Sequence, residues 1–409
     1  MNNNQPGDRY LRSLGLRPAQ DSDTLAAQLR QAVGDAQAEA ALSALYTRRT
    51  QQETAAGGLD RQETAAFYDL KNQHPQASLI LSAAHDWDLL CQTCQWVTQH
   101  PDAFGATILD VGCDCGLLSC FLAQTFPHSR ITSIDRSANG IHAAQQLAER
   151  LGLTNITFLH ADLETLPPMA FDTVFSSRTV QENYDPLLEN ARFLPLTHQG
   201  RICAQVFQRY TGLLCQFVKS GGTFVTIERM ERDRVFLGYC LALHEQGLDL
   251  MPESHQELHC QEGDHTTVLQ AFCGIKEGRT TTTDAEDFFI ATFQDALTWQ
   301  PRHLDVEGEL ILELCAQELI RGHFLHNPQG ARVGKLAIYT SKFDPEELFY
   351  YQGILGQPVQ VHRLSRGELS DVLALLEADL ATLTATTLSA HPFSFQDGVE
   401  LLLEEMEED

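Results

Sequence analysis

The amino-acid sequence predicts an α/β protein with an open, seven-stranded sheet, an N-terminal helical extension and a small C-terminal α/β module. The chain has 409 residues, more than one average domain. Hydrophobic residues make up 43% and charged residues 20%, so there is apolar surface for a large core, and disordered, collagen-like and coiled-coil chains are excluded. From about residue 77, short apolar runs alternate with amphipathic segments, which is typical of strand-helix-strand units. We therefore expect three regions: residues 1–76, 77–280 and 284–409.

The first region is rich in Ala and Gln, and its apolar residues have helical spacing. Leu25, Leu29 and Val33 form one such set, and a second set surrounds Leu42, before Gly57 and Gly58 break the pattern. We expect a helical extension that packs on the next region. A lid over a substrate pocket is the alternative.

The second region contains the predicted sheet. The predicted strands are 107–111, 130–134, 156–160, 173–176 and 222–228, followed by a hairpin of 256–261 and 266–275. The predicted helices are 117–125, 138–151, 210–220 and 235–245.

The third region begins after a polar segment, residues 278–284. Thr283 followed by Glu286 suits a capping box, so a new helix is expected there. The elements expected beyond it are helices at 284–299 and 307–321, a strand at 335–340, a helix at 345–352, a strand at 359–364 and two acidic helices. The final residues, Glu404 to Asp409, are most simply a solvated charge run.

The charge of the chain argues against a nucleic-acid partner. It has 28 Lys and Arg against 55 Asp and Glu, a net charge of −27, and residues 284–409 alone hold 7 basic against 23 acidic residues. Such a surface repels a polyphosphate unless one face is locally basic. We therefore expect a small-molecule partner rather than RNA or DNA.

Cysteine usage and hydropathy favour a cytoplasmic protein. Eleven cysteines are an odd number, and residues 1–10 are polar, without the apolar core of a signal peptide. No stretch approaches the ~18 uninterrupted apolar residues that a membrane span needs. Free thiols, a reducing compartment and no membrane contact are the expectation.

The most informative segment joins the first predicted strand to its helix. It reads Ile-Leu-Asp-Val-Gly-Cys-Asp-Cys-Gly-Leu-Leu-Ser over residues 108–119, and glycine at 112 and 116 lets the backbone turn sharply beside a ligand. A dinucleotide fingerprint would place glycine at 112, 114 and 117, where Asp114 and Leu117 stand instead. Because a carboxylate repels a pyrophosphate, NAD and FAD are disfavoured.

This turn resembles the first motif of the class I S-adenosylmethionine-dependent methyltransferases, D/E-x-G-x-G-x-G. The matching residues, which the resemblance implies bind the cofactor, are Asp110, Gly112, Cys113, Asp114 and Gly116. Asp114 replaces the central glycine of the motif, as it does in some bacterial tRNA adenine-N1 methyltransferases. The resemblance implies a Rossmann-like methyltransferase sheet over about residues 77–277 and S-adenosylmethionine as the cofactor.

Three further motifs of the family follow in the same order along the chain. The resemblance implies that Asp135 binds the ribose hydroxyls with Arg136 beside the adenine, that Asp162 and the Leu163 amide read the adenine, and that Ser176 ends the fourth strand at the cofactor. Asp135 and Asp162 can also be explained as helix N-caps. Four motifs in the right order favour the cofactor interpretation.

The acceptor side carries weaker signals. The substrate-pocket candidates after the fourth strand are Arg178, Glu182 and Tyr184, and no catalytic residue is assigned. Cys91 and Cys94 form a lone C-x-x-C pair, and zinc would need a second pair, so no metal site is expected.

We interpret the sequence as a methyltransferase that acts on a small molecule or a protein side chain. Methyl transfer depends mainly on proximity and alignment, so few residues need be catalytic. A tRNA or rRNA methyltransferase, suggested by Asp114, is one alternative. A non-catalytic cofactor-binding scaffold or sensor is the other. The sequence does not indicate an oligomeric state.

Overall fold

The computed structural model divides the chain into two compact units. One contains residues 1–187, 205–231 and 241–284, and the other contains residues 188–204, 232–240 and 285–409. The residues that the structure describes are 5–18, 21–34, 36, 40, 42, 44, 68–180, 196–262, 265–276, 285–292, 302–303, 316–342, 344–355, 360–396 and 399–402.

The N-terminal region is helical where it is described. The helices are α1 (Pro6–Ser13), α2 (Ser22–Val33) and α5 (Pro75–Gln99). The helix predicted from the spacing of Leu25, Leu29 and Val33 is confirmed as α2, which begins with an N-cap at Asp21 and ends at Gly34 with φ 70°. Gly57 and Gly58 lie outside the described residues.

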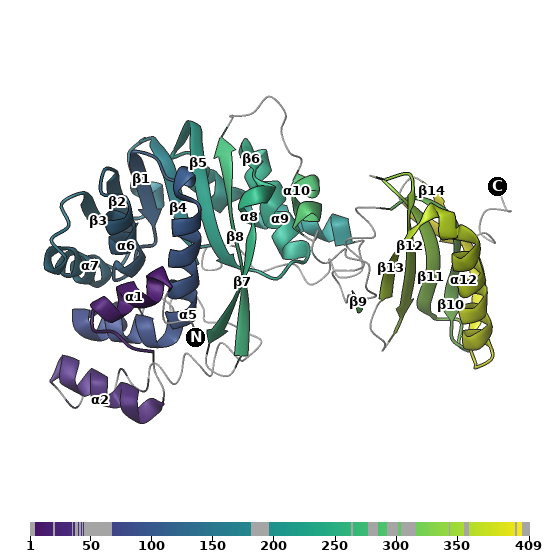
Figure 1. The fold of residues 1–409 in the computed structure, drawn as a ribbon, viewed down its shortest axis with the longest axis horizontal. Helices are drawn as coiled ribbons and strands as arrows, with labels where there is room; N and C mark the ends of the chain where they lie inside the picture. Colours follow the sequence, from purple (N-terminus) through teal and green to yellow (C-terminus); the bar gives the residue numbers. More distant parts are fainter. Residues whose placement is uncertain are drawn as a thin grey trace. The chain divides into compact units, whose positions relative to one another are not determined.

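Helix α1 packs closely against α5 (Figure 1). A Cβ atom added to Gly7 would lie 2.5 Å from the Cα atom of Cys91, so glycine is required for this approach. The Tyr10 hydroxyl donates a hydrogen bond of 2.9 Å to the carbonyl of Leu117, which ties α1 to the start of the next helix. The extension and the sheet domain therefore share one hydrophobic core.

The central sheet has the strand order β3-β2-β1-β4-β5-β8-β6, and β7 pairs with β8 (Figure 1). The strands are β1 (Thr107–Val111), β2 (Arg130–Asp135), β3 (Ile156–His160), β4 (Phe171–Ser177), β5 (Val218–Arg229), β6 (Leu248–Leu250), β7 (Gln256–Glu262) and β8 (His265–Lys276). The first five are parallel, and β6, β7 and β8 pair antiparallel. The predicted mixed α/β sheet is confirmed.

Helices α6 (Leu117–Thr125) and α7 (Ala138–Arg150) contact β2 and β3, and α5 packs on both helices. The strand order changes direction at β1, which has β2 on one side and β4 on the other. In an open α/β sheet, the crevice outside the carboxyl ends of the strands at such a point is where ligands bind. The carboxyl ends of β1, β2, β4 and β5 are therefore the place to look for a site.

The helix predicted at 210–220 has the wrong bounds, because α8 spans Leu196–Cys215. The strand predicted at 222–228 is confirmed as part of β5, which begins earlier, at Val218. The glycine pair 221–222 lies within a register irregularity between β4 and β5, with Gly221 at φ 72°. A glycine in a strand can mark a bulge as well as a boundary, and here it marks a bulge. Helix α9 (Arg234–Glu245) is close to its prediction.

The second unit contains an antiparallel sheet of order β15-β14-β10-β11-β12-β13-β9. Its elements are α10 (Ala285–Ala291), β9 (Arg302–His303), β10 (Ala316–His326), β11 (Arg332–Ser341), β12 (Glu347–Ile354), β13 (Gln360–Ser365), α12 (Leu369–Thr384), β14 (Ser389–Gln396) and β15 (Val399–Leu402). Leu376 and Leu380 of α12 pack on Leu336, Ile338 and Tyr350 of the sheet.

Several predictions for this unit were wrong. The helix predicted at 345–352 is strand β12, residues 316–321 of the helix predicted at 307–321 lie in β10, and the second acidic helix is replaced by β14 and β15. The run Leu348 to Tyr351 is buried on both faces, so it lacks the alternation that would mark a strand. Residues 278–284 and 404–409 lie outside the described residues.

No helix in the described part of the chain combines the length and the apolar character needed to cross a membrane.

Candidate functional site

The turn after β1 is built by three residues with left-handed backbone conformations. Gly112, Asp114 and Gly116 have φ angles of 74°, 46° and 81°. The N–H groups of Gly112 and Cys113 both donate to the carbonyl of Ile134, at 2.9 and 3.0 Å, which holds the turn against the end of β2. A Cβ atom at position 112 would lie 2.7 Å from a side-chain atom of Thr179. Glycine is therefore required here both by this crowding and by the positive φ angle.

Asp110 is a buried residue of β1, two positions before the first glycine of the turn. Its side chain is only 3% exposed, and its Oδ2 atom accepts hydrogen bonds from the hydroxyls of Ser119 (2.5 Å) and Ser133 (3.2 Å). Burial raises the pKa of Asp110 to about 6, although the two hydroxyls oppose the shift. Its described partners are groups of the chain itself, and direct contact with a cofactor stays a prediction.

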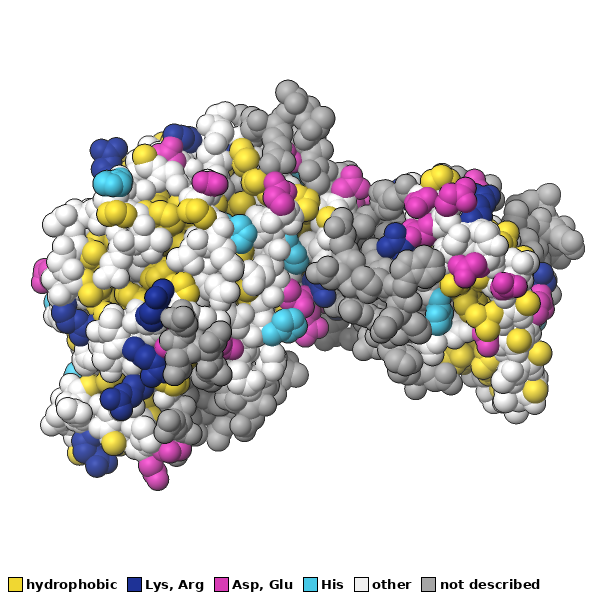
Figure 2. Space-filling model, viewed as in Figure 1, with side chains coloured by type: hydrophobic (Ala, Val, Ile, Leu, Met, Phe, Trp, Pro, Cys, Tyr) yellow, Lys and Arg dark blue, Asp and Glu magenta, His cyan; other side chains and the backbone are white. Residues whose placement is uncertain are grey.

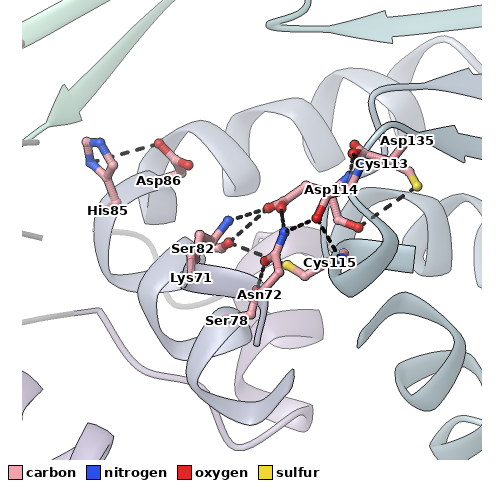
Figure 3. A network of polar contacts seen from close by, with 12 residues as sticks. Lys71, Asn72, Ser78, Ser82, His85, Asp86, Cys113, Asp114, Cys115 and Asp135 are labelled. Carbon is pink, nitrogen blue, oxygen red and sulfur yellow. Dashed lines mark hydrogen bonds and ion pairs between the residues drawn. The ribbon is translucent and has the colours of Figure 1, made fainter. Parts of the chain in front are cut away.

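Asp114 is the centre of a polar network that reaches the N-terminal region (Figure 3). Its Oδ2 atom accepts hydrogen bonds from the Lys71 ammonium and from the Ser82 hydroxyl (3.3 Å), and its Oδ1 atom accepts one from the Asn72 amide (2.9 Å). Burial alone would raise the pKa of Asp114, but the charge and hydrogen bond of Lys71 outweigh it, so the pKa lies below its ordinary value. The unexpected carboxylate in the turn is thus neutralised by a buried cation.

Asp135 lies at the carboxyl end of β2, directly beside the turn. Its Oδ2 atom accepts the N–H of Asp114 at 2.8 Å, and its Oδ1 atom accepts the N–H of Ser137 at 2.7 Å. Ser137, not Asp135, is the N-cap of α7. Arg136 is exposed, and its carbonyl contacts a ring nitrogen of His160 at 3.0 Å.

Asp162 and Leu163 follow β3, where the predicted adenine contacts lie. The Oδ1 atom of Asp162 accepts the N–H of Glu164 at 3.0 Å and so caps a short 3-10 helix, Leu163–Thr165. Leu163 is buried. Capping uses one oxygen of a group with about four lone-pair sites, so the capping role and the predicted adenine contact are compatible.

Comparison with known proteins agrees with this geometry. Residues 103–275 match a protein-family model described as a methyltransferase domain, and this stretch contains the turn, Asp135, Asp162 and β4. This part of the chain is therefore similar to a methyltransferase domain.

Relatives of this methyltransferase domain act on different acceptors according to their names. A ribosomal RNA small subunit methyltransferase G from Chlorobium luteolum is 37% identical over 106 residues, which cover 26% of this chain and 42% of that protein. A malonyl-[acyl-carrier protein] O-methyltransferase from Paenibacillus sp. is 25% identical over 183 residues, covering 44% of this chain and 62% of that protein. The chain thus spans less than two thirds of the length of these relatives.

A solved structure of magnesium protoporphyrin IX methyltransferase from Synechocystis PCC 6803 with bound S-adenosylmethionine is 16% identical to this chain. The likeness covers 64% of this chain and 99% of that one, at a TM-score of 0.34.

The donor set of the methyltransferase domain fits S-adenosylmethionine, the cofactor of this family. A ribose diol is bound well by a carboxylate, and Asp135 places one at the carboxyl end of β2, beside the turn, where it accepts the N–H groups of Asp114 and Ser137. The positive charge of the cofactor also favours an edge that carries several carboxylates. The roles of Asp135 and of the other predicted cofactor residues remain predictions.

The predicted acceptor side lies at the carboxyl ends of β4 and β5. Arg178, directly after β4, has a φ angle of 57°, and one guanidinium nitrogen lies 2.5 Å from the Oδ1 atom of Asp86. Asp86 is itself at a kink in α5, with non-helical angles of φ −112° and ψ 24°. Two residues with unusual backbone conformations therefore form an ion pair at this edge of the sheet, and such residues cluster at functional sites.

Glu228 of β5 is the buried carboxyl group on this side. It is 0% exposed, its Oε1 atom accepts from the Ser176 hydroxyl (3.1 Å) and the Thr179 N–H (3.2 Å), and its Oε2 atom accepts from the Val180 N–H (3.2 Å). Burial raises its pKa to about 7 against these hydrogen bonds. Ser176 thus contacts Glu228 on the acceptor side, and the predicted cofactor contact of Ser176 remains a prediction.

Two predicted substrate-pocket residues, Glu182 and Tyr184, lie outside the described residues. Cys91, Cys94, Cys113 and Cys115 are buried thiols. Among the residues that the structure describes, no group of three or more His, Cys, Asp or Glu side chains could hold a metal ion.

Five residues that form the polar contacts of this site were not predicted from the sequence: Lys71, Asn72, Ser82, Asp86 and Glu228. One signal was available: Lys71 is the single lysine in residues 1–76, and a carboxylate in a glycine turn calls for a nearby cation. Asp86 gave no signal, because a helix interior does not reveal a kink without Pro or Gly.

Proposed function

We propose that this protein is an S-adenosylmethionine-dependent methyltransferase whose acceptor is a small molecule bound at the carboxyl ends of β4 and β5. The observation that carries the proposal is the turn after β1, hydrogen-bonded to Asp135, with Asp162 directly after β3. All three lie inside a stretch that matches a methyltransferase family model. When bound, the cofactor supplies an electrophilic methyl group on a sulfonium. The chain's part is to hold and align the two reactants, effects worth up to ~7–11 kcal/mol in favourable cases.

The residues of the turn would hold the cofactor from one side. Asp135 would accept hydrogen bonds from the ribose hydroxyls, and Asp162 with the Leu163 amide would contact the adenine. Gly112 and Gly116 allow the left-handed backbone of the turn and its close packing on Thr179 and Ala144.

The acceptor would meet Arg178 and Asp86. Glu228 is a poor candidate for a general base, because it is buried and its two oxygens already accept three hydrogen bonds. We assign it instead the task of holding the backbone of Thr179 and Val180, which leads into the loop after β4. An acceptor that is already nucleophilic at neutral pH, such as a thiol, a phenol or a carboxylate, suits this arrangement.

A small-molecule acceptor is favoured by charge. The net charge of −27 opposes a polyanion, and Figure 2 shows Asp and Glu side chains spread over the visible face of the C-terminal unit. The relative named as a malonyl-[acyl-carrier protein] O-methyltransferase is compatible with a small acyl acceptor.

An RNA acceptor is the second candidate, and two observations favour it. The relative with 37% identity is named as a ribosomal RNA methyltransferase. The N-terminal region also carries exposed arginines, Arg9 and Arg12 on α1, Arg17 after it and Arg30 on α2, where Figure 2 shows dark blue side chains gathering; Arg12 is paired with Asp8. These are the locally basic face that an acidic protein would need.

The test is methyl transfer from S-adenosylmethionine with a labelled methyl group, using the full chain and cell extract separated into small-molecule, protein and RNA fractions. Label in the small-molecule fraction supports the proposal. Label confined to RNA, together with RNA binding that weakens steeply with salt, would favour the second candidate. No label in any fraction, despite cofactor binding, would contradict both.

A further inference from the structure

Asp114 stands where the methyltransferase motif has glycine, and its backbone is in the left-handed region at φ 46°. Glycine adopts this conformation freely, whereas a residue with a side chain persists there only where its surroundings hold it. The side chain of Asp114 must therefore contribute something that glycine cannot.

That contribution is a connection between distant parts of the chain. Lys71, Asn72 and Ser82 all donate hydrogen bonds to the Asp114 carboxylate, and they come from the helical stretch 68–72 and from α5 (Figure 3). Lys71 and Asp114 are 5% and 28% exposed, so water screens this ion pair little. We call these four residues the Asp114 clamp.

The clamp also reaches the carboxylate that the proposed function assigns to ribose. The Asp114 N–H donates to one oxygen of Asp135, and the Ser137 N–H donates to the other. The Asn72 amide contacts both the Asp114 carboxylate (2.9 Å) and the Ser137 hydroxyl (3.4 Å). The clamp thus holds the two backbone segments whose N–H groups orient Asp135.

We propose that Asp114 is a positioning residue: its clamp fastens the segment from Lys71 to Ser82 onto the glycine turn and makes the N-terminal extension a working part of the cofactor site. This inference rests on the proposed function. It predicts that restoring the glycine of the family motif weakens cofactor binding, because it releases the segment and leaves the Lys71 ammonium without its carboxylate.

The experiment is calorimetric titration of the full chain with S-adenosylhomocysteine. Asp114→Gly and Lys71→Met should each weaken binding about tenfold, since both remove the same charge-assisted contact. The double variant should also lose about tenfold, not a hundredfold, because residues in one contact are not additive. Affinity of Asp114→Gly equal to or tighter than wild type, or a hundredfold loss in the double variant, overturns the inference.

Lys219→Met is the matched control. It also removes a lysine from an ion pair, with Asp172 at the start of β4, but at the amino end of the strands. Its affinity should equal that of wild type. A loss as large as that of Lys71→Met would show a general effect of stability and would overturn the positioning role.

Hydrogen exchange supplies a readout that does not depend on any variant folding. In wild-type protein, S-adenosylhomocysteine should slow amide exchange in residues 68–82 as well as in the turn. Unchanged exchange in 68–82, while the turn is protected, overturns the inference and leaves the proposed function standing. Wild-type protein that binds no S-adenosylhomocysteine contradicts the proposed function itself.

Discussion

Two carboxyl groups at the same edge of the sheet have opposite electrostatic surroundings. Asp114, on the cofactor side, contacts the buried ammonium of Lys71, and its pKa is lowered. Glu228, on the proposed acceptor side, accepts hydrogen bonds from one hydroxyl and two backbone N–H groups, and burial raises its pKa to about 7. The neutral donors and the charge of Arg178 together do not offset the desolvation of Glu228, whereas the ammonium of Lys71, in direct contact, does so for Asp114.

The largest effect should come from the titration of Glu228. Its folded-state pKa lies above the ordinary value of 4.5, so between about pH 4.5 and 7 the folded protein keeps a proton that the unfolded chain releases. The free energy of unfolding should therefore fall as pH rises through this window, by up to about 3 kcal/mol, and level off above it. Denaturant unfolding from pH 4.5 to 8 measures this, and Glu228→Gln should flatten the curve.

The pKa of Asp110 is raised to about 6, so its titration also lowers the free energy of unfolding as pH rises. A smaller dependence on pH should therefore remain in Glu228→Gln. If wild type and Glu228→Gln showed the same slope, the assignment of the raised pKa to Glu228 would be wrong.

Replacing Asp135 separates the cofactor side from the acceptor side. Asp135→Ala should weaken S-adenosylhomocysteine binding roughly 10- to 100-fold, because hydrogen bonds to a charged group are worth about 1.5–3 kcal/mol. Calorimetric titration measures the loss. Binding within twofold of wild type would remove Asp135 from the cofactor site.

Removing Lys71 should leave Asp114 without a contacting cation, so that burial raises its pKa as it does for Glu228. Lys71→Met should lower the free energy of unfolding at pH 7 by about 2 kcal/mol, less than the ~3–5 kcal/mol of a fully buried pair, since Asp114 is 28% exposed. The pH dependence of this contribution to the free energy of unfolding should also change sign. In wild type, the pKa of Asp114 is lowered, so its stabilising contribution is lost as pH falls. In the variant, its pKa should be raised, so the free energy of unfolding should decrease as pH rises.

Denaturant unfolding at several pH values tests both parts. Lys219→Met removes a more exposed ion pair and should cost no more than about 0.5 kcal/mol. Equal losses in the two variants would mean that the burial of Lys71 has no special effect.

The smallest effect is expected on the acceptor side. Asp86→Asn weakens the hold on Arg178 and should reduce incorporation of labelled methyl about threefold to fivefold, equivalent to about 1 kcal/mol. Affinity for S-adenosylhomocysteine should stay within about twofold. A loss of cofactor affinity instead would place this ion pair on the cofactor side.

The helices and strands of the two units could be predicted from the sequence to different extents. In the methyltransferase unit, β1, β3 and α6 match their predicted ranges, and the glycine turn fixes where β1 ends and α6 begins. In the C-terminal unit, β12 was taken for a helix, because Phe349, Tyr350 and Tyr351 are all buried and show no alternation. Periodicity predicts an element only when one of its faces meets water.

The same contrast holds within the candidate site. Residues in the turn and at strand ends, such as Gly112 and Asp135, could be predicted from local motifs. For the clamp, the carboxylate of Asp114 indicates only that a cation is needed nearby. Local motifs do not show the contact with Lys71, which lies 43 positions before Asp114 and is brought to it by tertiary packing. The Asp86–Arg178 pair spans 92 positions and depends in the same way on the kink in α5.

A crystal structure of the full chain grown with S-adenosylhomocysteine would show directly whether the turn binds the cofactor. We expect the nucleoside at the turn of residues 112–116, with its ribose hydroxyls on Asp135 and its adenine beside Asp162, while Lys71 remains on Asp114. A ligand bound elsewhere, or excluded from the turn because the Asp114 side chain fills the crevice, would mean that the turn is not the cofactor site.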